Sequence, residues 1–64
     1  MIKLLLIEDD INLAYIIKSS LEEIIGGYEV ITSVNGDEGF QILAGYTPDV
    51  IVSDIDMPIL NGID

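Results

Sequence analysis

Acidic residues follow two short apolar segments of this 64-residue chain, and carboxylates in such positions can bind a metal ion. Glu8 and Asp9 follow the first of these segments, and Asp54 and Asp56 follow the last. If the fold gathered all of these carboxylates at one corner, they would repel one another strongly unless a cation neutralised their charge. An all-oxygen site of this kind suits Mg²⁺ or Mn²⁺ and not zinc. The sequence therefore predicts a metal site, provided that the fold brings these residues together.

The composition excludes several other kinds of chemistry. The chain has no cysteine and no histidine, so it has no disulfide, no Cys-based zinc site and no imidazole base for a serine nucleophile. Its net charge of -10 argues against direct binding to nucleic acid or to an anionic membrane. No apolar run approaches the roughly 20 residues of a transmembrane helix. The apolar N-terminal run ends in acidic residues without a small-residue cleavage site, so we expect a cytoplasmic protein.

Five elements are expected to position the acidic residues. Short apolar or β-branched runs predict strands, and apolar residues at three- and four-residue spacing predict a helix. Asp10 can cap the first helix, which Gly26-Gly27 would end, and Asn35 can cap the second. Residues 55–64 are expected to form a loop. The predicted order is a strand over Ile2–Ile7, a helix over 11–25, a strand over Tyr28–Ser33, a helix over 35–45 and a strand over Val50–Ser53.

The faces of the two helices follow from the same spacing. Lys18 and Glu22 are expected to lie largely outside the apolar stripe of the first helix. Gly39 weakens the second helix, because glycine inside a helix costs about 1 kcal/mol relative to alanine. The predicted apolar stripe of the first helix consists of Leu13, Ile16, Ile17, Leu21, Ile24 and Ile25.

Strands that alternate with helices imply one α/β domain with a parallel sheet and right-handed connections. We expect the strand order 2-1-3, in which the first strand lies between the other two. Ligands of open parallel sheets bind beyond the carboxyl ends of the strands, where the strand order reverses. This order would bring Glu8 and Asp9 beside Asp54 and Asp56.

The acidic motifs, taken together, resemble those of a response-regulator receiver domain. Residues 4–10 (Leu-Leu-Leu-Ile-Glu-Asp-Asp), followed by an amphipathic helix, are similar to the opening of that family. Residues 52–58 (Val-Ser-Asp-Ile-Asp-Met-Pro), with Gly62 beyond them, are similar to its phosphorylation-site strand and loop. Residues 35–39 resemble the family's entry into its second helix, although Gly39 stands where alanine is usual. The resemblance covers residues 1–64 and implies the N-terminal half of a flavodoxin-like receiver, with three strands, two helices and the phosphoacceptor loop.

The resemblance implies a role for each acidic residue. Asp54 is the nucleophile that accepts a phosphoryl group from the phosphohistidine of a sensor histidine kinase. Asp9 would bind Mg²⁺ (or Mn²⁺) directly, and Glu8 would do so directly or through water. Asp56 would contribute its backbone carbonyl. A carboxylate is a competent nucleophile toward an activated phosphoryl donor, so the protein would act as a phosphoacceptor and not as an enzyme.

A receiver also has two further strands with their helices, which residues 1–64 do not supply. These carry a hydroxyl residue and a lysine that normally contacts the phosphoryl group. Lys3 lies at the opposite end of its strand, and Lys18 lies more than two turns along its helix, so neither replaces that lysine. We therefore expect that this chain alone does not signal. We also expect the bare edge of the third strand to pair with a second copy, giving a homodimer.

Two other interpretations fit the same motifs. A haloacid-dehalogenase-like phosphatase would use Asp54 as nucleophile and Asp56 as acid/base. In that family the Asp-x-Asp pair comes near the N-terminus and further acids follow it, whereas here Glu8 and Asp9 precede it. The other interpretation is a designed or non-functional half-domain that self-assembles, which the mass of the oligomer and the affinity for Mg²⁺ would distinguish from a receiver.

Overall fold

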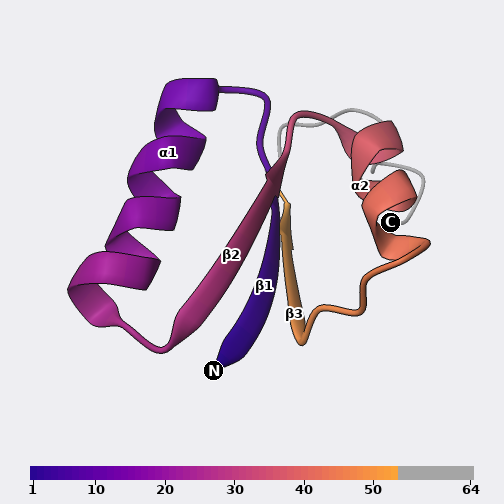
Figure 1. Ribbon diagram of the computed structural model, residues 1–64. Coiled ribbons are helices and arrows are strands. Elements are labelled where there is room, and N and C mark those ends of the chain that lie inside the picture. Colours follow the sequence, from indigo (N-terminus) through magenta and orange to yellow (C-terminus); the bar gives the residue numbers. More distant parts are fainter. Residues whose placement is uncertain (54–64) are drawn as a thin grey trace.

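The computed structural model describes residues 1–53, which form a three-stranded parallel sheet with helices on both faces (Figure 1). The fold class, the β-α-β-α-β order and the strand order 2-1-3 are confirmed. All three strands have the predicted bounds. The elements are β1 (Ile2–Ile7), α1 (Ile11–Ser19), a π-helical segment η1 (Ser20–Ile25), β2 (Tyr28–Ser33), α2 (Gly36–Leu43) and β3 (Val50–Ser53).

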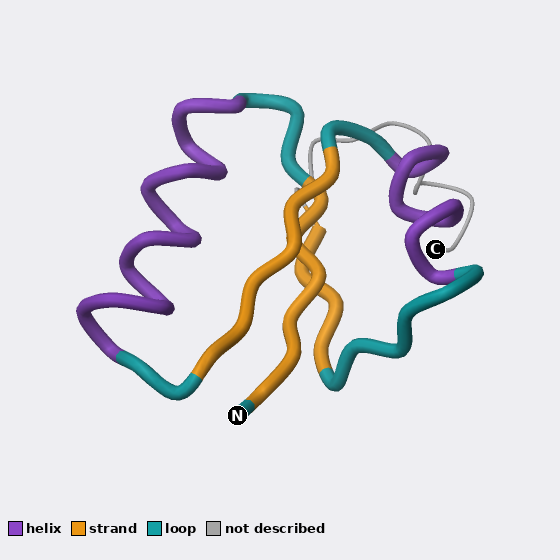
Figure 2. The backbone as a smooth tube through the Cα atoms, viewed as in Figure 1, coloured by secondary structure: helices purple, strands orange, loops and turns teal. Residues whose placement is uncertain are grey.

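β1 is the central strand and pairs in parallel on both of its edges (Figure 2). Along one edge its pairing with β2 runs from Ile2 opposite Tyr28 to Ile7 opposite Ser33. Along the other edge Leu4 lies opposite Val50, and Ile7 lies opposite the last residue of β3. Because both neighbours run in the same direction, the carboxyl ends of all three strands meet at one end of the sheet.

The core has two layers because successive side chains of β1 point to opposite faces. Leu4 and Leu6 face α1 and pack with Ala14 and Val30. On the other face β1 packs against α2, through Leu5, Ile7, Ile31, Ile42 and Leu43. A strand that is buried on both faces needs an apolar run without polar alternation, which the sequence of β1 provides.

Side chains cap the start of both helices, as predicted. The Asp10 Oδ1 atom accepts a hydrogen bond from the Leu13 backbone N–H at 3.1 Å. Asn35 Oδ1 accepts one from the Glu38 N–H at 2.8 Å. The Glu38 carboxylate accepts the N–H of Val34, the residue before the cap, at 2.9 Å, whereas a capping box would use the N–H of Asn35 itself. These caps set where each helix leaves the carboxyl end of its strand.

The predicted apolar stripe of the first helix is only partly right. Ile17 and Leu21 pack against the core, and Ala14, three residues before Ile17, is buried. The remaining four residues are exposed, and Lys18 and Glu22 are half-buried against β2 instead of lying off the packed face. In η1 the hydrogen bonds run from i to i+5, so three- and four-residue spacing no longer keeps side chains on one face. The exposed members of the stripe are Leu13, Ile16, Ile24 and Ile25.

Gly39 has a packing reason for interrupting α2. A Cβ atom at this position would lie 2.9 Å from Ile7 Cδ1 and 3.4 Å from the Ser33 hydroxyl oxygen. The missing side chain therefore lets α2 approach β1 and β2 closely. The lower helix propensity of glycine is offset by this contact with the sheet.

Candidate functional site

The carboxyl ends of β1 and β3 lie side by side. Ile7 pairs with Ser53, so Glu8 and Asp9 follow one strand next to the point where the other strand ends. This is the corner of the sheet at which the sequence predicted a site. Asp54 and Asp56, the other predicted site residues, lie outside the described residues.

Glu8 is held in place by backbone contacts on both sides. It is only 6% exposed, and its own N–H donates to the carbonyl oxygen of Ser33 at 2.9 Å. Its Oε2 atom accepts the N–H of Asp10 at 3.1 Å. Asp9, by contrast, is exposed to solvent. The two neighbouring carboxylates therefore differ, because Glu8 is fixed by the fold and Asp9 is free to meet a ligand from solution.

The donor chemistry at this corner fits a hard cation. Glu8 and Asp9 offer carboxylate oxygens, which Mg²⁺ and Mn²⁺ prefer. Within residues 1–53, no three acidic, histidine or cysteine side chains come close enough to hold a metal ion together. The described residues thus supply two of the four predicted ligands, and the complete metal site stays a prediction.

Both lysines of the chain are engaged away from this corner. The Lys3 ammonium lies 5.9 Å from the centre of the Tyr46 ring, and its backbone N–H donates to the Asp49 carboxylate at 2.9 Å. These contacts lie at the amino end of β1. The Lys18 ammonium donates to the Val30 carbonyl oxygen at 2.7 Å. Neither cation is therefore directed at the carboxyl ends of β1 and β3.

Lys18 and Glu22 form a contact that the sequence analysis missed. Glu22 Oε2 accepts the Val30 N–H at 2.7 Å and the Lys18 ammonium at 2.9 Å. Val30 thus has both of its backbone groups bonded to side chains of the preceding helix, and we call Lys18 and Glu22 the edge clamp. The Val30 N–H, followed by Lys18, lowers the pKa of the Glu22 carboxyl below its usual value. The four-residue spacing of Lys18 and Glu22 was the available signal, but it does not reveal a strand partner.

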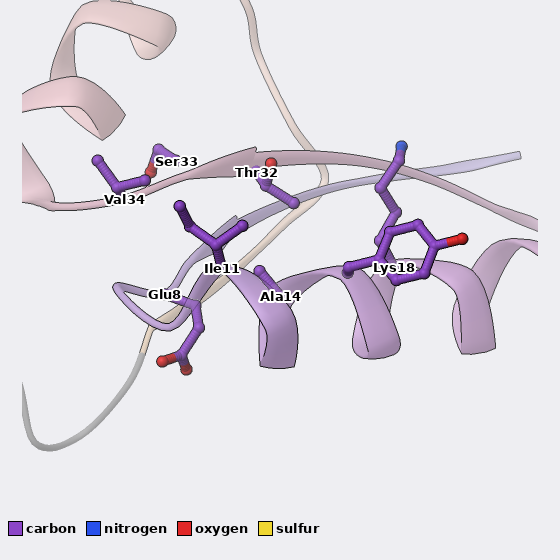
Figure 3. Close-up of a pocket in the computed structure, with 8 residues that line it drawn as sticks. Glu8, Ile11, Ala14, Lys18, Thr32, Ser33 and Val34 are labelled. Atoms are coloured by element: carbon purple, nitrogen blue, oxygen red, sulfur yellow. The ribbon is translucent and has the colours of Figure 1, made fainter.

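A cavity of about 310 Å³ lies between the start of α1 and the end of β2. Figure 3 shows Lys18 reaching from α1 toward β2, whereas the Glu8 carboxylate points away from the side chains of β2. The cavity therefore adjoins the acidic corner without the Glu8 carboxylate entering it. Its lining consists of Glu8, Ile11, Ala14, Tyr15, Lys18, Thr32, Ser33 and Val34.

The chain is similar to known proteins over almost its whole length. The response regulator receiver domain family matches residues 4–64. "Probable transcriptional regulator ycf27" of Cyanophora paradoxa is 37% identical over 60 residues, which is 94% of this chain and 24% of that protein. "Alkaline phosphatase synthesis transcriptional regulatory protein PhoP" of Bacillus subtilis is 34% identical over 62 residues, which is 97% of this chain and 25% of that protein. "Protein-glutamate methylesterase/protein-glutamine glutaminase 3" of Rhodospirillum rubrum is 38% identical over 63 residues, which is 98% of this chain.

The chain spans a quarter or less of the length of these relatives, down to 17% of the Rhodospirillum protein. The names of these relatives describe different activities, so the similarity does not extend to one shared output. No solved structure matches the chain significantly. Among the described residues, no helix is both long enough and apolar enough to span a membrane.

Proposed function

The chain belongs to the response-regulator receiver domain family, and from this premise we propose that it is the phosphoacceptor module of a two-component phosphorelay. Asp54 accepts the phosphoryl group in this proposal. The observation that carries it is the pairing of Ile7 with Ser53, which sets Glu8 and Asp9 beside the residue that directly precedes Asp54. Membership of this family replaces the alternative of a haloacid-dehalogenase-like phosphatase.

The proposed donor is the phosphohistidine of a sensor histidine kinase that acts on the protein containing this chain. A carboxylate oxygen of Asp54 forms a bond to phosphorus while the bond from phosphorus to the histidine nitrogen breaks. The imidazole leaves with the electron pair of that bond. Because the phosphoryl group remains on the chain, the chain is a substrate of the kinase and not an enzyme. A cytoplasmic location, without direct contact to nucleic acid or membrane, is part of the proposal.

The proposed cofactor is Mg²⁺ (or Mn²⁺). Asp9 is exposed and would bind it directly, while the buried Glu8 would bind it directly or through water. Asp54 and the backbone carbonyl of Asp56 would complete the protein ligands. When bound, the cation offsets negative charge on both the accepting carboxylate and the phosphoryl donor. The Asp10 N–H fixes the Glu8 side chain, so part of the site is ordered before any ligand arrives.

These 64 residues alone are not expected to signal. Lys3 and Lys18 are the only cationic side chains, and their ammonium groups contact Tyr46 and Val30. A phosphoryl group on Asp54 would therefore lack the lysine that the receiver resemblance supplies from a later strand. We expect little stable acyl phosphate when the chain is incubated with Mg²⁺ and a small phosphodonor.

A homodimer through β3 is the second part of the proposal. Val50, Ile51 and Val52 are 41%, 51% and 41% exposed, although the strand is apolar. No further strand within residues 1–53 pairs with the outer edge of β3. An unpaired apolar edge is a template for association, and a twofold axis would let two copies cover each other. The loop predicted after Asp54, also expected near this interface, lies outside the described residues.

Calorimetric titration of Mg²⁺ tests the proposed site. The chain should bind the cation weakly, and both Asp9→Ala and Asp54→Asn should weaken binding further. Glu29→Ala is the matched control, because Glu29 is an exposed acid that pairs beside Lys3, near the amino ends of the strands and away from the corner. Identical affinities in the parent chain and all three variants would remove the site and leave the self-assembling half-domain as the better interpretation.

Intact mass after incubation with the phosphodonor tests the acceptor. A stoichiometric gain confined to Asp54 would confirm the phosphoacceptor and show that these residues suffice without the lysine. A gain that persists in Asp54→Asn would place the acceptor elsewhere and overturn the proposal.

A further inference from the structure

The outer edge of β2 is occupied by side chains at the position where another strand would pair. The Val30 N–H donates to Glu22 Oε2 at 2.7 Å, and the Val30 carbonyl oxygen accepts from the Lys18 ammonium at 2.7 Å. The two side chains are joined to each other at 2.9 Å. One residue of an edge strand thus has its donor and its acceptor satisfied together, as a neighbouring strand would satisfy them.

Val30 is the middle one of three residues whose backbone groups face outward. The carbonyl oxygens of Gly27 and Ser33 face β1 and accept hydrogen bonds from the N–H groups of Ile2 and Glu8. Alternate residues of a parallel strand direct their backbone groups to opposite edges, so Tyr28, Val30 and Thr32 face away from β1. The edge clamp therefore occupies the centre of the free edge.

We propose that Lys18 and Glu22 block the outer edge of β2 against a second copy of the chain, and that β2 becomes a self-association surface when the clamp is removed. This inference is independent of the phosphoacceptor role. It concerns the edge opposite the one through which the homodimer is proposed.

The sequence of β2 suits antiparallel pairing with itself. Centred on Val30, two antiparallel β2 strands place Glu29 opposite Ile31 and Tyr28 opposite Thr32. Pairs of aromatic and β-branched side chains stabilise neighbouring strands, and no like charges face each other in this register. A parallel pair in register would instead set Glu29 against its own copy. The antiparallel arrangement is also a closed twofold interface, which favours a second copy as the partner.

The geometry beside the clamp leaves room for an incoming strand. Lys18 and Thr32 both line the cavity between α1 and β2, so open volume lies beside the clamp. The Lys18 side chain lines this volume and also bonds to Val30 at the outer edge. Two long, half-buried side chains are thus what separates β2 from a partner strand.

The first test compares the mass of the double variant Lys18→Ala/Glu22→Ala with that of the parent chain by sedimentation velocity. The matched control is Lys3→Ala/Glu23→Ala, which removes the same two charges at exposed positions. The mass of the clamp variant should at least double, while the control keeps the parent mass. Adding Thr32→Pro to the clamp variant should restore that mass, because proline removes an outward N–H of β2. A clamp variant that stays folded at the parent mass would overturn the proposal.

The second test keeps the proposal falsifiable if the double variant does not fold. Glu22→Met keeps the length of the side chain but removes the acceptor for the Val30 N–H and the Lys18 ammonium. A peptide of residues 27–34 serves as the probe strand. The variant should bind this peptide at least about tenfold more tightly than the parent chain. Equal affinities, or no binding to either, would overturn the proposal. The parent chain is the baseline in both tests, so the result does not depend on whether the homodimer forms through β3.

Discussion

The two outer edges of the sheet are built from similar residues but end in different surroundings. β2 and β3 are both rich in Val and Ile, yet Val30 is 2% exposed and Val52 is 41% exposed. The edge of β2 meets the edge clamp, which satisfies Val30 with helix side chains. Along β3 the described residues provide no corresponding partner strand. The comparison shows that side chains of the neighbouring helix, and not the composition of the strand, decide whether the backbone groups of an edge strand are hydrogen-bonded.

The position of the helices explains this difference. α1 and η1 run along the same face as Leu4 and Leu6 and reach the outer edge of β2 (Figure 1). α2 lies on the opposite face and packs on residues of β1 and β2. Val50 and Val52 lie on the α1 face and Ile51 on the α2 face, because they pair beside Leu4, Leu6 and Leu5. Neither helix covers these three side chains fully.

The largest effect on stability should come from a change in β1, the central strand that pairs with both β2 and β3. Leu5→Ala removes a side chain with no exposure, and we expect a loss of about 2–5 kcal/mol in the free energy of unfolding. Ile51→Ala is the matched change, because Ile51 pairs beside Leu5 but is 51% exposed; we expect a loss of about 1 kcal/mol. Urea denaturation measures both. Equal losses would mean that β3 is packed as well as β1 and would break the comparison.

Introducing a charge on β3 or on β2 should show which of the two edge strands forms the proposed homodimer. Val52 and Thr32 both pair beside Leu6, on opposite sides of β1 and on the same face. Val52→Lys should raise the dissociation constant of the proposed homodimer at least about tenfold and weaken folding with it. Thr32→Lys should leave the dissociation constant unchanged. Sedimentation equilibrium decides between them, and a homodimer that survives Val52→Lys places the interface elsewhere.

Loss of either helix cap should reduce the free energy of unfolding by less, and each loss should affect only the helix that the cap begins. Asp10→Ala and Asn35→Ala each remove a capping acceptor, and we expect a loss of about 1 kcal/mol in the free energy of unfolding for each. Only Asp10→Ala loosens the helix that carries the edge clamp. Hydrogen exchange at the Val30 amide should therefore accelerate more in Asp10→Ala than in Asn35→Ala. The same acceleration in both variants would show that the edge of β2 does not depend on α1.

Lowering the pH should have the smallest effect. The Val30 N–H and Lys18 hold the pKa of Glu22 below its usual 4.5, so the charged clamp stabilises the folded chain above that value. This contribution is lost as the pH falls through the lowered pKa of the folded state. The thermal midpoint of the parent chain should therefore fall more steeply below pH 4.5 than that of Glu22→Gln. Glu23→Gln is the control, and a profile in which it matches Glu22→Gln would contradict the assignment.

Local signals in the sequence were sufficient for the elements and their order. Each strand is a short apolar or β-branched run with a turn or cap residue beyond it, and Asp10 and Asn35 begin the helices as predicted. The helix face was harder to predict. The pattern assumes α-helical geometry, whereas residues 20–25, with the exposed Ile24 and Ile25, are π-helical. Leu13 and Ile16 are exposed within the regular helix α1, which this geometry does not explain. The half-buried positions of Lys18 and Glu22 depend on a strand that comes later in the sequence. Periodicity within the helix carries no information about such a partner.

The candidate site was likewise predictable from the sequence only in part. The end of a strand predicted where Glu8 and Asp9 would lie, and the pairing of β1 with β3 agrees with that prediction. The burial of Glu8 and its bond to the Asp10 N–H could not be predicted, because both arise from the path of the backbone into α1. The predicted roles of Asp54 and Asp56 lie beyond the residues that the structure describes.

The strand order also has a consequence for how the chain folds during synthesis. β1 leaves the ribosome before β2 and β3 but lies between them in the sheet, so neither of these partners is available until β2 follows. Ile2 pairs with Tyr28, whereas Leu4 pairs with Val50, which closes a loop nearly twice as long. Closing the longer loop costs at most about 0.6 kcal/mol of additional entropy. The order in which the strands leave the ribosome, and not this entropy, therefore determines which pair forms first. Lys18, Glu22 and Val30 all belong to the first β-α-β unit. The nascent chain can therefore close one edge of its sheet before the strand that forms the other edge has been made.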